Sequence, residues 1–317
     1  MSGDQGKLIV LAIGGNSLIT DSAHRKVEDQ YASTLETCRR IVKLLEAGHR
    51  VVITHGNGPQ VGFILRRSEL ASHELHIVPL DSCGADTQGA IGYLLQRAMY
   101  NCMLGWPRRI PVATVVTQVL VDRDDPAFQE PTKPIGSFLD EETATQRRQQ
   151  DGWHIKEDAG RGFRRVVASP RPKRIVEIDA IRSLIDRGFV VVAVGGGGIP
   201  VIEDEEGSLV GADAVIDKDR ASGLLAREVD ADVLLISTSV EKAYLRFGKP
   251  DQQPLDVLTV AEARRYIQEG HFAPGSMRPK IDAMANFVES GGREAMLTDP
   301  PNLLRAIAGE TGTRVVP

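Results

Sequence analysis

The sequence predicts an α/β fold, an αβα sandwich around a mainly parallel sheet with a protruding lid subdomain. Short, continuously apolar runs recur along the chain, as in parallel strands that are buried on both faces. Segments with helical periodicity separate these runs, and this alternation is typical of a parallel sheet covered by helices on both sides. One long polar stretch interrupts the alternation, and it is the reason for expecting a lid.

The expected elements follow one another as strand–helix units. Strands are expected at residues 8–13, 50–54, 112–121, 189–194, 232–236 and 294–298. Helices are expected at residues 28–47, 59–72, 84–101, 219–229, 259–269 and 279–290. The first helix is typical, because Leu35, Cys38 and Val42 recur on one face and Gly48 follows as a stop signal. Residues 122–172, rich in Pro, Gly, Arg and Asp, form the expected lid.

Composition limits the class of protein. Of the 317 residues 42% are hydrophobic, which is enough to bury a large core in one α/β domain or two closely packed lobes. The net charge of −5 leaves no basic footprint for nucleic acid or an anionic membrane. No apolar run reaches the roughly 20 residues of a membrane helix, and the short polar N-terminus does not resemble a signal peptide. The three cysteines form no metal-ligand pair, so we expect reduced thiols in a cytoplasmic protein.

Glycine-rich turns follow three of the expected strands, at Gly14–Asn16, Gly56–Gly58 and Gly195–Gly198. Ligands of an open parallel sheet bind beyond the carboxyl ends of its strands. Glycine at such a place lets backbone N–H groups approach a phosphate or a carboxylate. A single turn of this kind is common for steric reasons alone, but three at corresponding strand ends predict an extended anion site.

Several familiar phosphate motifs are absent from the sequence. It contains no G-x-x-x-x-G-K-[ST] loop and no protein-kinase catalytic loop. The spacing of Gly56, Gly58 and Gly62 resembles a loosened dinucleotide fingerprint. Pro59 stiffens that turn, however, and a different loop follows the first strand, where such fingerprints usually stand. A dehydrogenase is therefore disfavoured.

Three lysines stand in contexts that suit phosphate chemistry. Lys133 lies between two prolines in the lid, Lys218 comes just before an expected helix, and Lys280 follows a turn with Gly and Pro. Most lysines are solvated surface charges, but phosphoryl transfer requires positioning and positive charge above all. Asp219 either braces Lys218 and Lys280 electrostatically or caps the following helix, and the two roles are compatible.

Long motifs follow one another along the chain, namely Gly14–Asn16, Thr54–Gly62, Cys83–Ala85 with Gln88–Gly89, Pro131–Gly136, Gly160–Gly162 with Arg164–Val167, Gly195–Pro200, Val215–Asp219, Phe272–Met277 and Gly309–Thr313. With these motifs in this order, the sequence resembles, nearly end to end, the carbamate kinases of the amino acid kinase family. The resemblance implies one domain over residues 7–317, the lid at about 122–172, and usually a homodimer. It also implies reversible phosphoryl transfer between ATP plus carbamate and ADP plus carbamoyl phosphate, with Mg²⁺, used to make ATP in arginine or nitrogen catabolism.

The resemblance further implies roles for individual residues. Lys218 and Lys280 would neutralise transition-state charge, with Asp219 orienting them. Lys133 would replace a first-strand lysine that many relatives have and this sequence lacks. The N-terminal half would bind the small acid and the phosphoryl group through Gly14, Gly15, Asn16, Gly56, Asn57 and Gly58. Residues from about 190 to 317 would bind the nucleotide, near Lys242, Tyr244, Ala273, Pro274, Gly275 and Met277. The metal ligands stay unassigned, with Asp217 as a group that would stand near the metal.

Some positions depart from the family pattern. Arg278 stands where glycine is expected, Asp86–Thr87 replace the commoner Met-Ser pair, and Ser237–Ser239 differ near the nucleotide. We expect these changes to affect the substrate preference and the preferred direction of the reaction more than the type of reaction. We expect His55 to serve structural hydrogen bonding, because a carbamate anion needs no general base. Two alternatives stay open: an enzyme of the same scaffold that acts on another small acid, and a non-catalytic sensor of nucleotide or carbamoyl phosphate.

Overall fold

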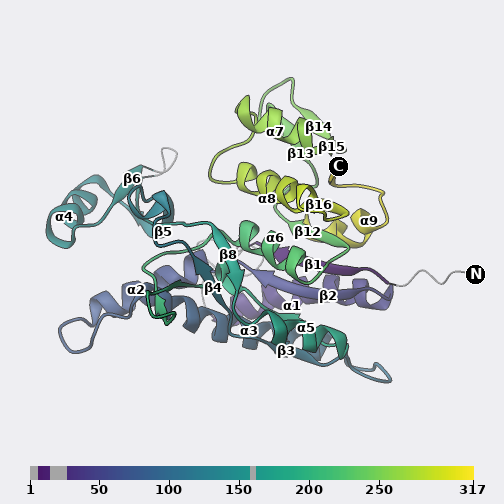
Figure 1. Ribbon diagram of the computed structural model, residues 1–317, viewed down its shortest axis with the longest axis horizontal. Helices are drawn as coiled ribbons and strands as arrows, with labels where there is room; N and C mark the ends of the chain where they lie inside the picture. Colours follow the sequence, from purple (N-terminus) through teal and green to yellow (C-terminus); the bar gives the residue numbers. More distant parts are fainter. Residues whose placement is uncertain (1–5, 15–26, 158–161) are drawn as a thin grey trace, which may run out of the picture.

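The central feature of the computed structural model, which describes residues 6–14, 27–157 and 162–317, is an eight-stranded sheet (Figure 1). Its strand order is β15-β17-β16-β12-β1-β2-β9-β3. The strands are β1 (Leu8–Ile13), β2 (Arg50–His55), β3 (Val112–Thr114), β9 (Val190–Val192), β12 (Val233–Ser237), β15 (Val257–Thr259), β16 (Glu294–Thr298) and β17 (Thr313–Val316). Neighbouring strands run parallel except β16 and β17. The mainly parallel sheet is therefore confirmed.

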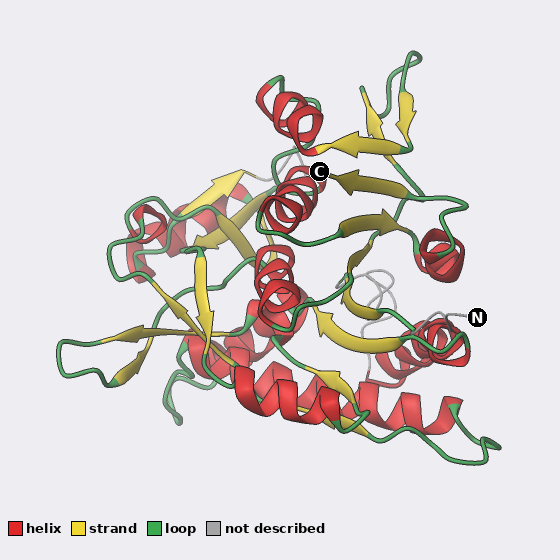
Figure 2. Ribbon diagram, turned by 45° about the vertical axis from the view of Figure 1, so that its right-hand side comes forward, coloured by secondary structure: helices red, strands yellow, loops and turns green. Residues whose placement is uncertain are grey.

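Helices cover both faces of this sheet, and the residues of β1 show how. Its even-numbered side chains belong to one core with residues of α5, α6 and α8, and its odd-numbered side chains to another with residues of α1, α3 and α9. Successive strand residues point to opposite faces, so a fully apolar strand needs both covers. The helices are α1 (Val27–Glu46), α3 (Leu80–Cys102), α5 (Ile178–Asp186), α6 (Lys218–Glu228), α8 (Met277–Glu289) and α9 (Leu303–Ile307). Figure 2 shows them flanking the strands, which confirms the αβα sandwich.

The single strand predicted over residues 112–121 is wrong, because the chain divides there between two sheets. β3 ends at Thr114 in the main sheet, and β4 (Gln118–Val121) belongs to a four-stranded sheet of order β11-β10-β4-β8. The buried side chain of Gln88 accepts from Thr117 N at 2.8 Å and donates to Thr117 O at 3.1 Å. This amide replaces the strand hydrogen bonds that the turn gives up. The other strands of the smaller sheet are β8 (Pro172–Ile175), β10 (Ile199–Glu203) and β11 (Leu209–Gly211).

Part of the predicted lid forms a separate three-stranded antiparallel sheet of order β5-β7-β6, which we call the lid sheet. It consists of β5 (Lys133–Leu139), β6 (Ile155–Glu157) and β7 (Phe163–Val167), with α4 (Glu141–Asp151) beside it. The lid sheet and α4 project at the left of Figure 1. A small apolar cluster that includes Val61, Ile135 and Val167 joins it to α2 (Gly58–Leu70). At this joint a Cβ on Gly62 would stand 2.4 Å from Gly136 Cα, so the two backbones touch.

The remaining elements lie outside the main layers. They are α7 (Val260–Gln268), the hairpin of β13 (Ala243–Leu245) and β14 (Gln253–Leu255), and the short 3₁₀ turns at Pro126–Phe128, Gly195–Gly197 and Pro300–Asn302. The three cysteines are free thiols. In the part of the chain that the structure describes, no helix has the length and apolarity needed to cross a membrane.

Candidate active site

The glycine turns predicted to form an anion site do lie at one edge of the sheet. β2 pairs in parallel with both β1 and β9, so Gly14, Gly56 and Gly195 follow neighbouring strand ends. The second turn is also tied to the end of β1, because Gly56 N donates to Ile13 O at 3.1 Å. Gly196 has a φ of +70°, and a Cβ there would stand 2.0 Å from Asn57 Nδ2. Of the first turn, Gly15 and Asn16 lie outside the described residues.

A cavity of about 330 Å³ opens at this edge between the sheet and the lid sheet. The first turns of α2, α6 and α8 and the start of β5 contribute to its wall. Eight of the predicted site residues line it: Gly56, Asn57, Gly58, Lys133, Lys218, Asp219, Gly275 and Lys280. Segments that are far apart in the sequence thus bring three lysines to one hollow.

Asp219 lies between two of these lysines. Lys218 Nζ donates to Asp219 Oδ1 at 2.5 Å, and Lys280 Nζ donates to Asp219 Oδ2 at 2.9 Å. The Asp219 side chain is only 4% exposed and each lysine side chain 14%. Burial alone would raise the pKa of Asp219, but the two ammonium groups hold the pKa below its usual value. Burial lowers the pKa of Lys218, and the Asp219 carboxylate opposes that shift. The carboxylate therefore fixes two positive charges side by side.

The third lysine reaches the cavity from the lid sheet. Lys133 Nζ donates to Asp217 Oδ2 at 2.7 Å, which links β5 to the start of α6. Asp217 is also the N-cap of α6, because its Oδ1 accepts from Asp219 N at 3.0 Å and from Arg220 N at 3.3 Å. Burial would raise the pKa of Asp217, but the ammonium group of Lys133 holds it well below its usual range. Asp217 therefore stays ionised, and it keeps both its ion pair with Lys133 and its hydrogen bonds to the first turn of α6.

His55 lies beneath the glycine turns and is fully buried. Its Nδ1 is 3.3 Å from Gly56 O, and its Nε2 has no hydrogen-bond partner in the described part of the chain. Burial lowers the pKa of His55 to about 4, so the ring is neutral at neutral pH. A Cβ on Gly195 would stand 2.5 Å from His55 Nε2, so the ring packs directly on the third glycine turn.

Other predicted residues do not line this cavity. Lys242 pairs with Asp256 at 2.5 Å, and Tyr244 lies on β13 with its ring centroid 5.8 Å from that of Phe247. Ala273 and Pro274 are exposed in the turn before α8, and Met277 begins that helix. Gly14 follows β1 but is likewise absent from the cavity wall.

Sequence reasoning did not foresee the roles of two charged residues at the site. Asp217, which was expected to stand near a metal, pairs with Lys133. Arg164 of β7 lines the cavity and donates to Gly136 O at 3.1 Å. The neighbouring Arg165 lies on the other side, where it meets Glu69 at 3.5 Å. The strand period of two would have separated these arginines, once residues 163–167 were known to form a strand.

The described residues offer no cluster of three or more His, Cys, Asp or Glu side chains that could hold a metal ion. The two carboxylates at the cavity, Asp217 and Asp219, are both committed to lysines. A Mg²⁺ ion that enters with a nucleotide takes most of its ligands from phosphate and water. Asp217 and Asp219 thus fit a Mg²⁺ ion that enters with a nucleotide better than a Mg²⁺ ion that the protein alone would hold.

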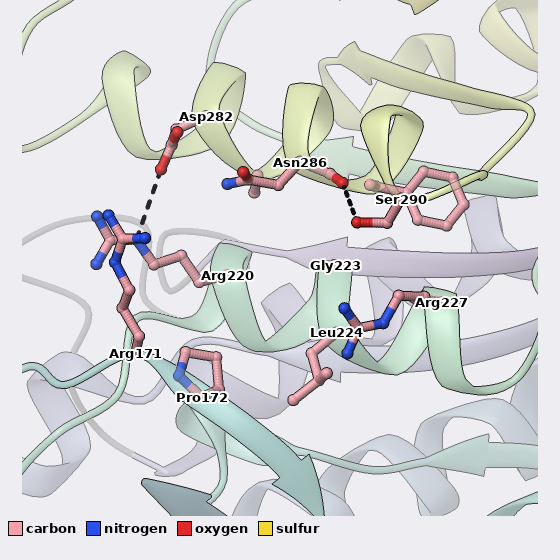
Figure 3. A pocket seen from close by; sticks show the side chains of 11 residues that line it. Arg171, Pro172, Arg220, Gly223, Leu224, Arg227, Asp282, Asn286 and Ser290 are labelled. Atoms are coloured by element: carbon pink, nitrogen blue, oxygen red, sulfur yellow. Dashed lines mark hydrogen bonds and ion pairs between the residues drawn. The ribbon is translucent and has the colours of Figure 1, made fainter. Parts of the chain in front are cut away.

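A second groove, of about 260 Å³, lies between α6 and α8 (Figure 3). Arg171, Arg220 and Arg227 line it, and none of the predicted site residues does. Asp282 bridges two guanidinium groups here, at 2.6 Å from Arg264 and 3.7 Å from Arg220. Asp282 of α8 thus lies between Arg220 of α6 and Arg264 of α7 (Val260–Gln268), outside the cavity.

Comparisons with known proteins agree with this geometry. Residues 7–299 match the model of the amino acid kinase family. The chain is 51% identical to the Carbamate kinase-like protein YahI of Escherichia coli (strain K12), over 98% of this chain and 99% of that protein. It is 47% identical to the carbamate kinase of Thermococcus kodakarensis, with the same coverage. The structure of carbamate kinase from Giardia lamblia bound to AMP-PNP superimposes with a TM-score of 0.90 at 39% identity, covering 98% of both chains.

Proposed function

The chain belongs to the amino acid kinase family, and from this premise we propose that it is a carbamate kinase. The reaction is reversible phosphoryl transfer between ATP plus carbamate and ADP plus carbamoyl phosphate. The observation that carries the proposal is the bridge of Asp219 between Lys218 and Lys280 at the cavity wall. Two ammonium groups fixed side by side stabilise the charge that develops on a migrating phosphoryl group, and this supports a kinase over a non-catalytic sensor.

The lysines supply charge where the transfer develops it. During phosphoryl transfer negative charge spreads over the equatorial oxygens of the migrating group, and fixed cations stabilise it. Lys218 and Lys280 serve this role from the core, and Lys133 serves it from the lid sheet. Three ammonium groups and the guanidinium group of Arg164 line the cavity with only two carboxylates, so its lining carries two more positive than negative charges before any ligand binds. The carbamate oxygen is already an anion, so the buried, neutral His55 is not needed as a base.

We assign the two substrates to different parts of the chain. The turn of Gly56, Asn57 and Gly58 borders the small acid, and Gly14, Gly15 and Asn16 surround the phosphoryl group. Residues from about 190 to 317 bind ATP or ADP, with Gly275 at the cavity and Lys242, Tyr244, Ala273, Pro274 and Met277 farther along the nucleotide. Residues of about 122–172 act as the lid subdomain of the single domain at 7–317. Mg²⁺ is bound through the phosphates.

We also propose a cytoplasmic homodimer that makes ATP in arginine or nitrogen catabolism. Exposed aromatic side chains on α3 support self-association, because Tyr93 and Tyr100, seven residues apart, are 57% and 55% exposed. Leu104, just beyond this helix, is 61% exposed. Large exposed apolar groups on one face are typical of an interface. Light scattering of the purified protein tests this, and Tyr100→Glu should convert a dimer to a monomer.

A single assay tests the proposed activity. The purified protein is mixed with ADP, Mg²⁺ and carbamoyl phosphate, and ATP is measured. ATP formation is expected, and its absence from a folded protein would contradict the proposal. An enzyme for another small acid would leave carbamoyl phosphate unused, and a sensor would bind it in calorimetry without turnover.

A further inference from the structure

The side chain of Asn57 is not used in the way its position suggests. Asn57 is the N-cap of α2, where asparagine usually accepts a hydrogen bond from the first helical N–H groups, yet its side chain makes no such bond. It lies instead against Gly196, is 5% exposed, and lines the cavity. The helix thus forgoes a common stabilising contact and leaves this amide facing the site.

The hydrogen bonds of Thr87 fix which way the amide is turned. Thr87, fully buried on α3, has one hydroxyl hydrogen and gives it to Gly84 O at 2.7 Å. A carbonyl oxygen only accepts, so the Thr87 oxygen must in turn accept from Asn57 at 2.8 Å. The group facing Thr87 is therefore Nδ2. Oδ1 of Asn57 has no donor among the described residues and is left for a ligand.

We propose that Asn57 reads the amino group of the substrate, and that Thr87 is the positioning residue that sets its orientation. This inference deepens the proposed function and rests on it. An amide held in this way presents one acceptor, Oδ1, beside the second hydrogen of Nδ2. The H₂N–C=O edge of carbamate and carbamoyl phosphate presents a donor beside an acceptor. The two edges are complementary, so the site selects a small acid that bears an N–H group.

An isosteric acid without that group should be rejected. Acetyl phosphate has the shape of carbamoyl phosphate but places a methyl group where the amino group would stand. Binding it would leave Oδ1 buried without a donor, and sites built around a polar substrate group discriminate strongly for this reason. Thr87 also stands at one of the positions that depart from the family pattern, and it retains the hydroxyl that the commoner serine would supply.

The first test measures ATP formation from carbamoyl phosphate and from acetyl phosphate with the same protein. In Thr87→Val, which keeps the shape and removes the hydroxyl, the ratio of the two kcat/KM values should fall about tenfold or more. Thr87→Ser, which keeps the hydroxyl, should restore the ratio of the parent protein. A merely structural role would lower both activities alike. An unchanged ratio in a folded Thr87→Val protein would overturn the proposal.

A second test uses the unaltered protein, in case the valine variant does not fold. Phosphonoacetamide and 2-oxopropylphosphonate are stable mimics of the two acyl phosphates and differ only in NH₂ against CH₃. Calorimetry should show about tenfold or more tighter binding of the amide, and equal affinities would overturn the inference. This measurement needs no turnover. Failure of the specificity inference is thus distinguishable from failure of the proposed function, which would appear as no ATP from carbamoyl phosphate.

Discussion

Two lysine–carboxylate arrangements meet in the same cavity, and they are built differently. Lys218, Lys280 and Asp219 all come from helices that pack on the central sheet, and their side chains are 4 to 14% exposed. Lys133 and Asp217 join the lid sheet to the core, and their side chains are 30% and 14% exposed. The first arrangement is held by a packed interior, which preorganises its charge. The second is a single contact between two parts of the molecule, so a ligand can break it without disturbing the core.

The largest effect is expected from breaking the core arrangement. Asp219→Asn leaves two buried ammonium groups without their counter-charge, so kcat should fall by about 10³-fold or more. Unfolding should also become easier, because a buried charge that loses its partner costs about 3 kcal/mol. Coupled ATP assays and thermal unfolding by circular dichroism measure the two effects. The matched control is Asp282→Asn, which removes a carboxylate of α8 between Arg220 of α6 and Arg264 of α7, outside the cavity, and should keep normal activity. Equal losses in both variants would show that Asp219 acts only through stability.

Breaking the Lys133–Asp217 pair, which joins the lid sheet to the core, should affect activity more than stability. Lys133→Ala should lower turnover by about 10²-fold or more, because one fixed cation near the phosphoryl group is lost. Its free energy of unfolding should fall less than in Asp219→Asn, since the Lys133 side chain is 30% exposed and Asp217 keeps its hydrogen bonds to the first turn of α6. Lys173→Ala is the control, because Lys173 also pairs with a distant carboxylate, Asp122, but lies away from the cavity. Near-normal activity of the Lys133 variant would remove the lid lysine from the mechanism.

An intermediate effect is expected from moving the lid sheet, and Lys133 with it, without substituting any residue of either arrangement. In Gly62→Ala the new Cβ would stand 2.4 Å from Gly136 Cα, so α2 and β5 must separate slightly. Displacing Lys133 in this way should lower kcat/KM about tenfold, with stability reduced by about 1–3 kcal/mol. Gly89→Ala on α3 meets no atom within 4 Å and serves as the control. A Gly62 variant with the parent's kinetics would show that the position of the lid sheet does not matter to turnover.

The smallest effect concerns pH. Burial lowers the pKa of Lys218, so this lysine loses its proton, and the site its charge, at a lower pH than an exposed lysine would. The rate should therefore fall as pH rises, with its alkaline limb below the ordinary lysine value of about 10.5. In Asp219→Asn the limb should move to still lower pH, because the carboxylate that opposes the shift is gone. Profiles of kcat between pH 7 and 11 measure this. A limb that stays in place in the variant would assign it to another group.

The sequence predicted the core arrangement better than the contact between lid and core, and the reason is local. Lys218 and Asp219 are adjacent, and Lys280 stands in a turn whose Gly and Pro residues mark it. The apolar runs that form the central sheet are equally local signals, because each strand shows its burial in its own residues. Lys133 and Asp217 are 84 residues apart, and their contact depends on where the lid sheet settles. No pattern of residues in the sequence predicts where the lid sheet packs against the core.

The prediction of a single strand over residues 112–121 was wrong for the same reason, because the structure there depends on a contact that is distant in the sequence. The whole run is rich in β-branched residues and is typical of one strand. Its division depends on Gln88, a helical residue 29 positions away whose amide takes over the hydrogen bonds at Thr117. Thr87, the residue before Gln88 on the same helix, likewise contacts a distant residue, because it accepts a hydrogen bond from Asn57. Buried polar side chains that serve distant backbone or side-chain atoms leave no periodic pattern, and they shape the site as much as the strands do.

The place of β1 in the sheet affects how the chain can be synthesised and folded. β1 ends at Ile13 but pairs on one side with β12, which begins at Val233. At about 5–20 residues per second, a ribosome needs roughly 10 to 45 s to make the intervening segment. During that interval one apolar edge of the first strand has no neighbour. The nascent protein is therefore most exposed to misassembly before its last third has emerged.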